Sequence, residues 1–170
     1  AQPTLHDLRT QAAAKAIQVA LWVGLGECHP GVHPCLFGGA ADQLVAKGYV
    51  FTSQTDTEVM VHLIDALYQG DLLQAVMQAV QQLQGAYAIA VIAKDEPHRV
   101  VGARAGSPLI WGVGKSENFL ASDAMALAGV TDQIVYLAEG DVVDIGLNHC
   151  QVYDASQQAV SRAVQTVKAQ

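Results

Sequence analysis

Apolar residues recur three and four positions apart in two neighbouring stretches of the chain. Residues 57–68 and 71–83 both show this spacing, which predicts two amphipathic helices. Asp71 stands at the start of the second stretch, where an aspartate side chain can cap a helix. Alanine-rich residues 5–23 predict a further helix from propensity, and residues 40–47 predict a short one.

Short apolar runs separated by turn residues fill the second half of the sequence. The longest run is 85–93, GAYAIAVIA, which predicts a strand that is buried on both faces, followed by a turn at 95–98 around Pro97. Helices followed by many strands favour an α+β layered domain over a parallel βαβ sheet, with residues 1–170 as one domain. The remaining predicted elements are strands at 49–51, 100–103, 108–113, 118–121, 134–137 and 142–145, a helical turn at 123–127, and a closing hairpin of 151–153 with 160–167.

Composition and charge exclude several classes of protein. Of the 170 residues, 51% are hydrophobic and 15% are charged, which is typical of a globular chain and not of a disordered one. The net charge of -7 argues against nucleic acid as a partner, and no apolar run reaches the roughly 18 to 20 residues of a membrane span. Three cysteines, an odd number, and the absence of a secretion signal predict a cytoplasmic protein.

Polar side chains crowd the start of the first amphipathic helix. Residues 53–59 read Ser-Gln-Thr-Asp-Thr-Glu-Val, at a predicted strand-to-helix junction. Thr55 and Glu58 fit a capping box, because a hydroxyl at the N-cap and an acid three positions later satisfy free N–H groups. That box does not need Asp56, so this carboxylate is the one left for a ligand.

Ordered local patterns from Gly48 to Asp141 include this junction, and together they carry a family resemblance. They resemble the class II glutamine amidotransferase domain of glutamine–fructose-6-phosphate aminotransferase (isomerizing), or glucosamine-6-phosphate synthase, across about residues 44–165. The set is more specific than any single member. The patterns are Gly48-Tyr49 with Phe51, 53–59, Leu83 with Gly85-Ala86-Tyr87-Ala88, Ala103-Arg104 with Gly106-Ser107-Pro108-Leu109, Gly112-Val113-Gly114, Glu117-Asn118-Phe119, Ala121-Ser122-Asp123 and Glu139-Gly140-Asp141.

The resemblance implies an N-terminal-nucleophile hydrolase fold, a four-layer α/β/β/α sandwich, here expected to be incomplete at its N-terminus. It implies L-glutamine as the ligand, hydrolysed to glutamate and ammonia without a cofactor. In the family the ammonia passes to a sugar-isomerase domain that acts on fructose 6-phosphate, and these 170 residues hold no counterpart of that domain. The sequence leaves open whether the protein forms a homodimer.

The resemblance gives Asp56 the role of holding the α-ammonium group of glutamine. A fixed carboxylate beside a cation forms a charge-assisted hydrogen bond, which selects an amino acid over a simple amide. The alternative is a solvated or capping aspartate. We interpret 104–109 as a structural turn, and Asn118, Ser122 and Asp123 as support for the fold.

Residues 1–43 depart from the family pattern, so the catalytic residues stay unassigned. The family nucleophile is a cysteine at the mature N-terminus, whereas this sequence begins with Ala1, whose methyl group cannot attack an amide. The family's carboxylate-binding and oxyanion segments are also missing, although Gly39 would offer an oxyanion N–H if 37–39 were the counterpart. Three explanations stay open: an inactive, truncated or rearranged relative that binds glutamine or a protein partner, a misread N-terminal sequence, and a nucleophile on a part not included.

One loop carries residue types that zinc accepts. Cys28, His29, His33 and Cys35 lie within eight positions, but the C-x2-C spacing is missing and two prolines stiffen the segment. We therefore favour a plain loop and expect no metal. The phosphate-loop interpretation of 112–116 fails, because Leu109 stands where that motif needs glycine.

Overall fold

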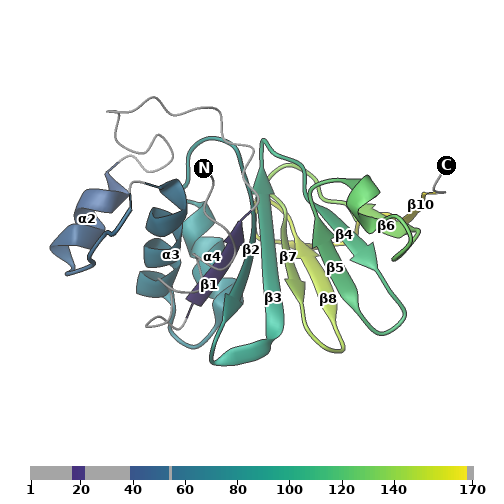
Figure 1. The fold of residues 1–170 in the computed structure, drawn as a ribbon, viewed down its shortest axis with the longest axis horizontal. Coiled ribbons are helices and arrows are strands. Elements are labelled where there is room, and N and C mark those ends of the chain that lie inside the picture. The colour runs from purple at the N-terminus through teal and green to yellow at the C-terminus, as the bar shows by residue number, and fades with distance from the viewer. Residues whose placement is uncertain (1–16, 22–38, 54, 168–170) are drawn as a thin grey trace.

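A computed structural model describes residues 17–21, 39–53 and 55–167. Helices lie along one face of a six-stranded sheet, and a four-stranded sheet packs on part of the other face (Figure 1). The elements are, in order, β1 (Ile17–Leu21), α2 (Ala40–Ala46), α3 (Asp56–Leu67), α4 (Leu72–Val80), β2 (Tyr87–Ala93), β3 (Glu96–Ala105), β4 (Ile110–Val113), β5 (Asn118–Ala121), the 3-10 helix η1 (Ala124–Leu127), β6 (Gln133–Tyr136), β7 (Val142–Ile145), β8 (Cys150–Tyr153), β9 (Ala159–Val160) and β10 (Gln165–Thr166).

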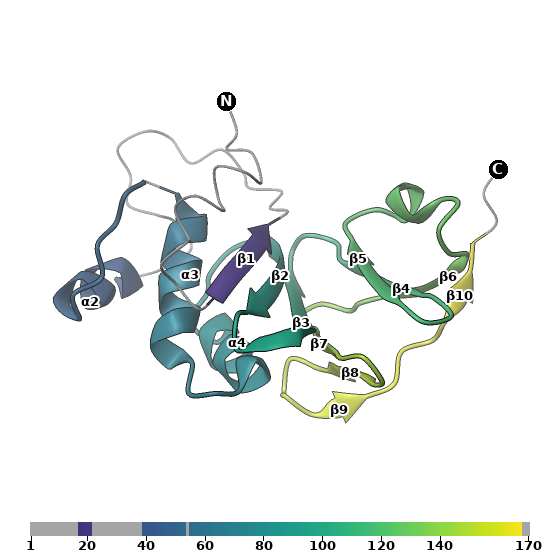
Figure 2. The same cartoon turned by 60° about the horizontal axis from the view of Figure 1, so that its bottom comes forward.

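The two sheets are antiparallel in every strand pair. The larger sheet has the order β1-β2-β3-β7-β8-β9, and the smaller has the order β10-β6-β4-β5. The helical end and the smaller sheet lie at opposite ends of the molecule in both views (Figures 1 and 2). The α+β class expected from the sequence is confirmed.

Alternating side chains of the strands build three apolar clusters. Ile89 and Val91 of β2 pack under α3 and α4, whereas Ala88 points to the other face and meets the smaller sheet. Ile110 and Ile134 of the smaller sheet pack against η1 on its outer side. The described residues therefore form a helical layer, two sheets and one 3-10 turn beyond them.

Helices α3 and α4 match their sequence predictions closely. Thr55 is the N-cap of α3, and Asp71 caps α4 by accepting hydrogen bonds from the N–H groups of Leu73 and Gln74. Each helix buries its apolar stripe against the larger sheet. Local capping chemistry and helical periodicity were sufficient here, because both act within a few residues.

The helix predicted over 5–23 is wrong where the structure describes it. Residues Ile17–Leu21 form β1, which pairs antiparallel with β2 from Ile17 opposite Ala93 to Leu21 opposite Ile89. Helix propensities differ by less than about 1 kcal/mol per residue, so a complete strand ladder overrides them. Residues 1–16 and 22–38 lie outside the described residues.

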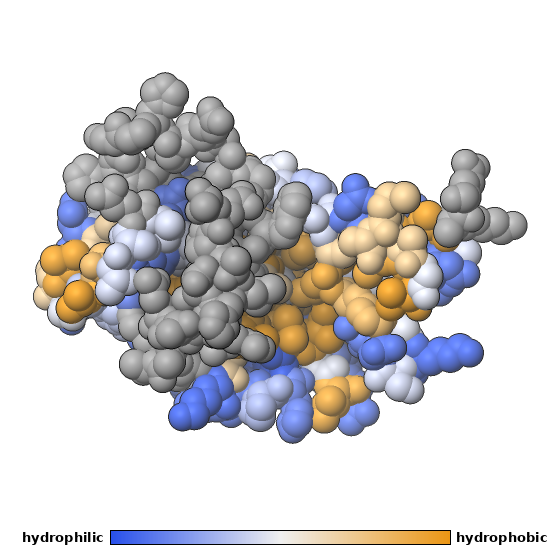
Figure 3. Space-filling view, viewed as in Figure 1, coloured by the Kyte–Doolittle hydropathy of each residue, from blue (hydrophilic) through white to orange (hydrophobic). Residues whose placement is uncertain are grey.

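The predicted strand 85–93 is buried on both faces for only part of its length. Ile92 of β2 is 40% exposed, although it shares a face with the buried Ala88. The smaller sheet therefore covers only part of that face. Apolar side chains also gather in the middle of the molecular face shown in Figure 3.

Two predicted local elements are wrong. Residues 49–51 form no strand and run beside α3 instead. The turn after β2 is Lys94–Asp95, so Pro97 lies inside β3. The pairing of β2 with β3 shifts register between Val91 and Ala93, and such an irregularity tolerates a residue without an N–H group.

The predicted closing hairpin is split between the two sheets. β9 pairs with β8, whereas β10 crosses to the smaller sheet and pairs with β6. Arg162 lies between them and donates to the fully buried Asp141 carboxylate at 2.7 and 2.9 Å. This ion pair fixes the point where the chain leaves one sheet for the other.

The Gly106→Ala variant is expected to lose about 2 kcal/mol of unfolding free energy. Gly106 has φ of 67°, and an added Cβ would lie 2.7 Å from the Cβ of Ala86. Gly129→Ala is the matched control, because Gly129 has φ of 81° but open space around it, so about 1 kcal/mol is expected. Urea unfolding measures both values, and equal losses would contradict a role for the close approach.

Candidate active site

The candidate site begins where α3 begins. Thr55 is extended, with φ of -100° and ψ of 141°, and its Oγ1 accepts the N–H group of Glu58 at 3.4 Å. Val59 and Leu63 bury the inner face of the helix in the core. The position of the first helical residue, Asp56, is therefore set by a cap on one side and by packing on the other.

Asp56 is a buried carboxylate in the first turn of α3. It is 7% exposed, and among the described residues no hydrogen-bond donor or cation pairs with its side chain. Burial raises the pKa of Asp56 above its ordinary value, because the charged form loses water contacts. An unpaired, buried carboxylate is costly in the free protein, and a cationic ligand would offset that cost.

Glu58 makes a different set of contacts from those of a capping box. One carboxylate oxygen accepts the N–H and hydroxyl groups of Thr52 at 2.8 and 3.0 Å. The other accepts the N–H and hydroxyl groups of Ser53, both at 2.6 Å. The capping box is thus half formed: Thr55 caps Glu58, but Glu58 reaches past the N-cap to the preceding chain.

The Glu58→Gln variant is expected to lose stability at neutral pH but not in acid. Burial opposes the charged carboxylate, but the hydrogen bonds from Ser53 and Thr52 outweigh it and hold the pKa of Glu58 below its ordinary value. The stabilisation is fully present above the unfolded-state pKa of about 4.3 and disappears as the pH falls through the folded-state pKa. Urea unfolding of the parent and of Glu58→Gln from about pH 7 to about pH 3 checks this. A difference in unfolding free energy between the two proteins that does not change with pH would contradict the prediction.

Residues 49–53 lie along one face of α3 as a strap, a name we keep for this segment. Tyr49 donates its hydroxyl to Asp65 at 2.9 Å, and its ring lies 5.0 Å from the buried His62 ring. Phe51 meets the same imidazole edge-on at 4.7 Å. Glu58 is the third residue of α3 that holds the strap. It lies on the same helical face as His62 and Asp65, because these residues follow it at spacings of four and then three positions.

Gly39, the candidate oxyanion donor, stands at the N-cap of α2. It is exposed and has φ of 94°. Neither a hydrogen bond nor an ion pair joins Gly39 to Asp56 within the described ranges. The helices that these two residues open share the same core cluster, through Leu44 and Val59.

The sequence also drew attention to its first residue, to the loop with zinc-type side chains and to its cysteines. Ala1, Cys28, His29, His33 and Cys35 lie outside the described residues. Cys150 is described, unpaired and half-buried in β8. Burial and the nearby Asp144 raise the pKa of the Cys150 thiol to about 12, so it is a poor nucleophile at neutral pH.

The polar residues interpreted as structural make structural contacts. Arg104 donates to the Glu139 carboxylate at 2.6 Å and to the Leu137 carbonyl at 2.9 Å. Asn118 accepts the indole N–H of Trp111, and Asp123 caps η1 by accepting an N–H group. Their roles in the fold are confirmed.

Sequence reasoning missed a cluster of charges around Arg99. Its guanidinium donates to Asp144 at 2.7 and 2.8 Å, to Glu96 at 2.7 Å and to Asp71 at 2.9 Å. The Asp144 hydrogen bonds raise the pKa of Arg99, while burial alone would lower it. The cluster joins the start of α4 to β3 and β7, and only the Asp71 cap gave a signal in the sequence.

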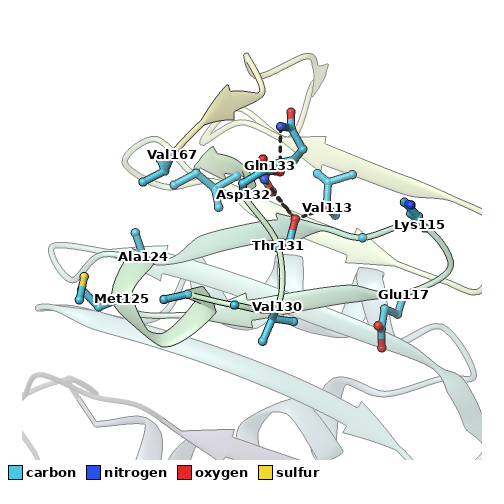
Figure 4. Close-up of a pocket in the computed structure, with 14 residues that line it drawn as sticks. Val113, Lys115, Glu117, Ala124, Met125, Val130, Thr131, Asp132, Gln133 and Val167 are labelled. Carbon is cyan, nitrogen blue, oxygen red and sulfur yellow. Dashed lines mark hydrogen bonds between the residues drawn. The ribbon is translucent and has the colours of Figure 1, made fainter. Parts of the chain in front are cut away.

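A large pocket lies away from Asp56. Its volume is about 1030 Å³, and its wall includes Val113, Met125, Val130 and Thr131 (Figure 4). Thr131 donates its hydroxyl to the Val113 carbonyl at 2.7 Å, so its proton is engaged within the wall. Val113 belongs to β4 and Met125 to η1, whereas Val130 and Thr131 lie on the connection from η1 to β6. No residue of α3 lines this pocket, so it is separate from the Asp56 site.

The described residues hold neither a cluster of metal ligands nor a membrane-spanning helix. No three His, Cys, Asp or Glu side chains in this part of the chain come together as ligands for a metal ion. None of the helices in the described ranges has the length and apolar character needed to cross a membrane.

Comparisons with known proteins agree on one family. A sequence family described as a glutamine amidotransferase domain matches residues 39–129. The glutamine–fructose-6-phosphate aminotransferase (isomerizing) of Bordetella pertussis is 62% identical over 126 residues, which are 74% of this chain and 21% of that protein. The same-named protein of Idiomarina loihiensis is 54% identical over 125 residues, 72% of this chain and 20% of that protein. The chain thus spans about a fifth of the length of these relatives.

Solved structures support the fold. The glutamine phosphoribosylpyrophosphate amidotransferase of B. subtilis aligns with a TM-score of 0.65 at 20% identity, over 84% of this chain and 30% of that one. A structure described as the allosteric regulatory enzyme of purine biosynthesis aligns with a TM-score of 0.59 at 23% identity, over 80% of this chain and 34% of that one. With the sequence match over more than half of its residues, this chain belongs to the glutamine amidotransferase domain family.

Proposed function

We propose that residues 1–170 act as the glutaminase domain of a glutamine–fructose-6-phosphate aminotransferase (isomerizing). The domain would hydrolyse the side-chain amide of L-glutamine and release ammonia to a sugar-isomerase partner that acts on fructose 6-phosphate. The identity of 62% to a protein of that name supports this assignment. The single structural observation that supports glutamine as the ligand is the buried carboxylate of Asp56 at the start of α3, which has no partner among the residues that the structure describes.

Asp56 recognises the α-ammonium group of glutamine in this proposal. Its carboxylate is shielded from water, so its interaction with a cation is stronger than that of a solvated acid. The first turn of α3 adds a favourable dipole for the negative charge. Together these features select ligands that carry an α-ammonium group and reject simple amides.

A second candidate function is glutamine binding without turnover. The chemistry that the resemblance implies needs a thiol with a free amine beside it. Cys150 is the cysteine that the structure describes, and its raised pKa and its place in β8 do not suit that role. An adduct with a glutamine-analogue electrophile, located by peptide mass mapping, separates the two candidates: an adduct at a terminal cysteine supports the glutaminase.

We also propose a cytoplasmic location, which the unpaired thiol of Cys150 supports, because reducing compartments keep thiols free. A homodimer stays a prediction that light scattering would check.

Calorimetric titration tests the ligand. We expect L-glutamine to bind the protein about 10- to 150-fold more tightly than glutaramate, its analogue without the amino group, from the strength of hydrogen bonds to charged groups. L-Asparagine, whose amide is one carbon nearer, is the control for chain length. Equal affinity for glutamine and glutaramate, or binding of neither, would overturn the assignment of Asp56.

A further inference from the structure

We propose that Glu58 is a positioning residue for recognition of the α-ammonium group. It holds the chain on the N-terminal side of Asp56 and thereby fixes where the Asp56 carboxylate lies. This inference rests on the proposed function, and it adds a residue that touches no ligand but sets the selectivity of the site.

Among the described residues, no donor holds the Asp56 carboxylate. The backbone at the start of α3 sets the point from which this buried side chain extends, and the packing around it limits the rotamers that remain. A shift of that backbone therefore shifts the carboxylate.

Glu58 fixes that backbone from the preceding side. Its two oxygens accept four hydrogen bonds from Thr52 and Ser53, at 2.6 to 3.0 Å. A helix cap does not require these bonds, because Thr55 already satisfies the N–H group of Glu58. The carboxylate binds the incoming chain to the first turn of the helix that carries Asp56.

Ser53 passes this constraint to the residue next to Asp56. The Ser53 hydroxyl lies 2.6 Å from the Glu58 carboxylate and 2.9 Å from the Thr55 hydroxyl. It also accepts the Thr55 N–H group at 3.4 Å. Hydrogen bonds thus run from Glu58 through Ser53 to Thr55, the residue that precedes Asp56.

Of the side chains glutamate and glutamine, only the carboxylate satisfies all four donors. A carboxylate accepts through both oxygens, whereas the amide of glutamine accepts through one oxygen and donates through its nitrogen. In Glu58→Gln the amide nitrogen faces the donors of either Thr52 or Ser53. That side of the junction loses its hydrogen bonds, and Asp56 is then held in a wider range of positions.

The experiment is calorimetric titration with L-glutamine and glutaramate. In Glu58→Gln we expect the preference for glutamine to fall about 3- to 10-fold, the equivalent of losing one ordinary hydrogen bond, with the affinity for glutaramate unchanged. Ser53→Ala keeps the Glu58 charge but breaks the link to Thr55, and its preference should fall in the same direction. An unchanged preference in Ser53→Ala would show that Glu58 acts through its charge and would overturn the positioning role.

Asp71→Ala is the matched control for loss of a helix-starting contact. It removes the cap of α4 and should cost stability, but the preference for glutamine should stay at the parental value. A similar fall in Asp71→Ala would mean that general loosening explains the result, and the inference would be wrong. The parent and Asp56→Asn distinguish failure of the proposed function from failure of the role of Glu58. If the parent shows no preference for glutamine over glutaramate, the proposed function is overturned. If the preference is lost in Asp56→Asn but kept in Glu58→Gln, only the role of Glu58 is overturned.

Discussion

Replacing Arg99 with methionine is expected to destabilise the fold by about 3 to 5 kcal/mol, the usual cost of leaving a buried charge without its partner. Asp144 is 4% exposed, and Arg99 holds both of its oxygens. Burial opposes the charged carboxylate, but Arg99 and His149 outweigh it and keep the pKa of Asp144 below its ordinary value. Urea unfolding at neutral pH measures the loss of unfolding free energy. The slope of that free energy against urea concentration is compared between the parent and the variant.

The double variant Arg99→Met with Asp144→Leu is the control for this prediction. The double variant removes the buried Asp144 charge together with its partner, so it should be more stable than Arg99→Met alone. A loss of below about 1 kcal/mol in Arg99→Met would place the cluster with ordinary surface ion pairs and contradict its structural role.

The Asp56→Asn variant is expected to bind glutamine more weakly by about 1.5 to 3 kcal/mol, the range for hydrogen bonds to charged groups. Its unfolding free energy at neutral pH should equal or exceed that of the parent. The reason is that burial raises the pKa of Asp56 above the unfolded-state value, so the charged form costs stability above that pH and asparagine removes the cost. Loss of binding with no loss of stability would mark a residue kept for its ligand.

Calorimetry with glutamine and thermal unfolding check the two halves of this prediction. Asp42→Asn is the matched control, because Asp42 also lies in the first turn of a helix but is exposed. Its glutamine affinity should equal that of the parent. Unchanged glutamine binding in Asp56→Asn would remove Asp56 from the site, and a lower melting temperature would favour a capping role for it.

The sequence predicted what depends on neighbouring residues. The caps at Thr55 and Asp71 act over three or four positions, and the apolar stripes of α3 and α4 repeat over four. The family resemblance followed from short motifs in order, and the comparisons confirm it. Asp56 was singled out for the same local reason, because the cap did not need it.

Contacts between residues far apart in the sequence could not be predicted from neighbouring residues. Arg99 meets Asp144 across 45 residues, and β10 meets β6 across about 30. The pairing of β1 with β2 overrode an alanine-rich helical pattern, because a strand ladder outweighs propensities of a fraction of a kcal/mol. The strap forms no strand, although one was predicted at its start. Its Ser53 N–H group donates to Glu58 of α3, and its Phe51 ring packs on His62 of the same helix.

The order of amino acids was sufficient to indicate the family, the capped helices and the one acid at the start of α3 that no cap needs. The folded chain was required to show that this acid is buried and has no partner among the described residues, and that Glu58 binds the strap instead of completing a capping box. Burial and hydrogen-bond partners depend on which segments meet in space, whereas capping and periodicity depend on residues a few positions apart.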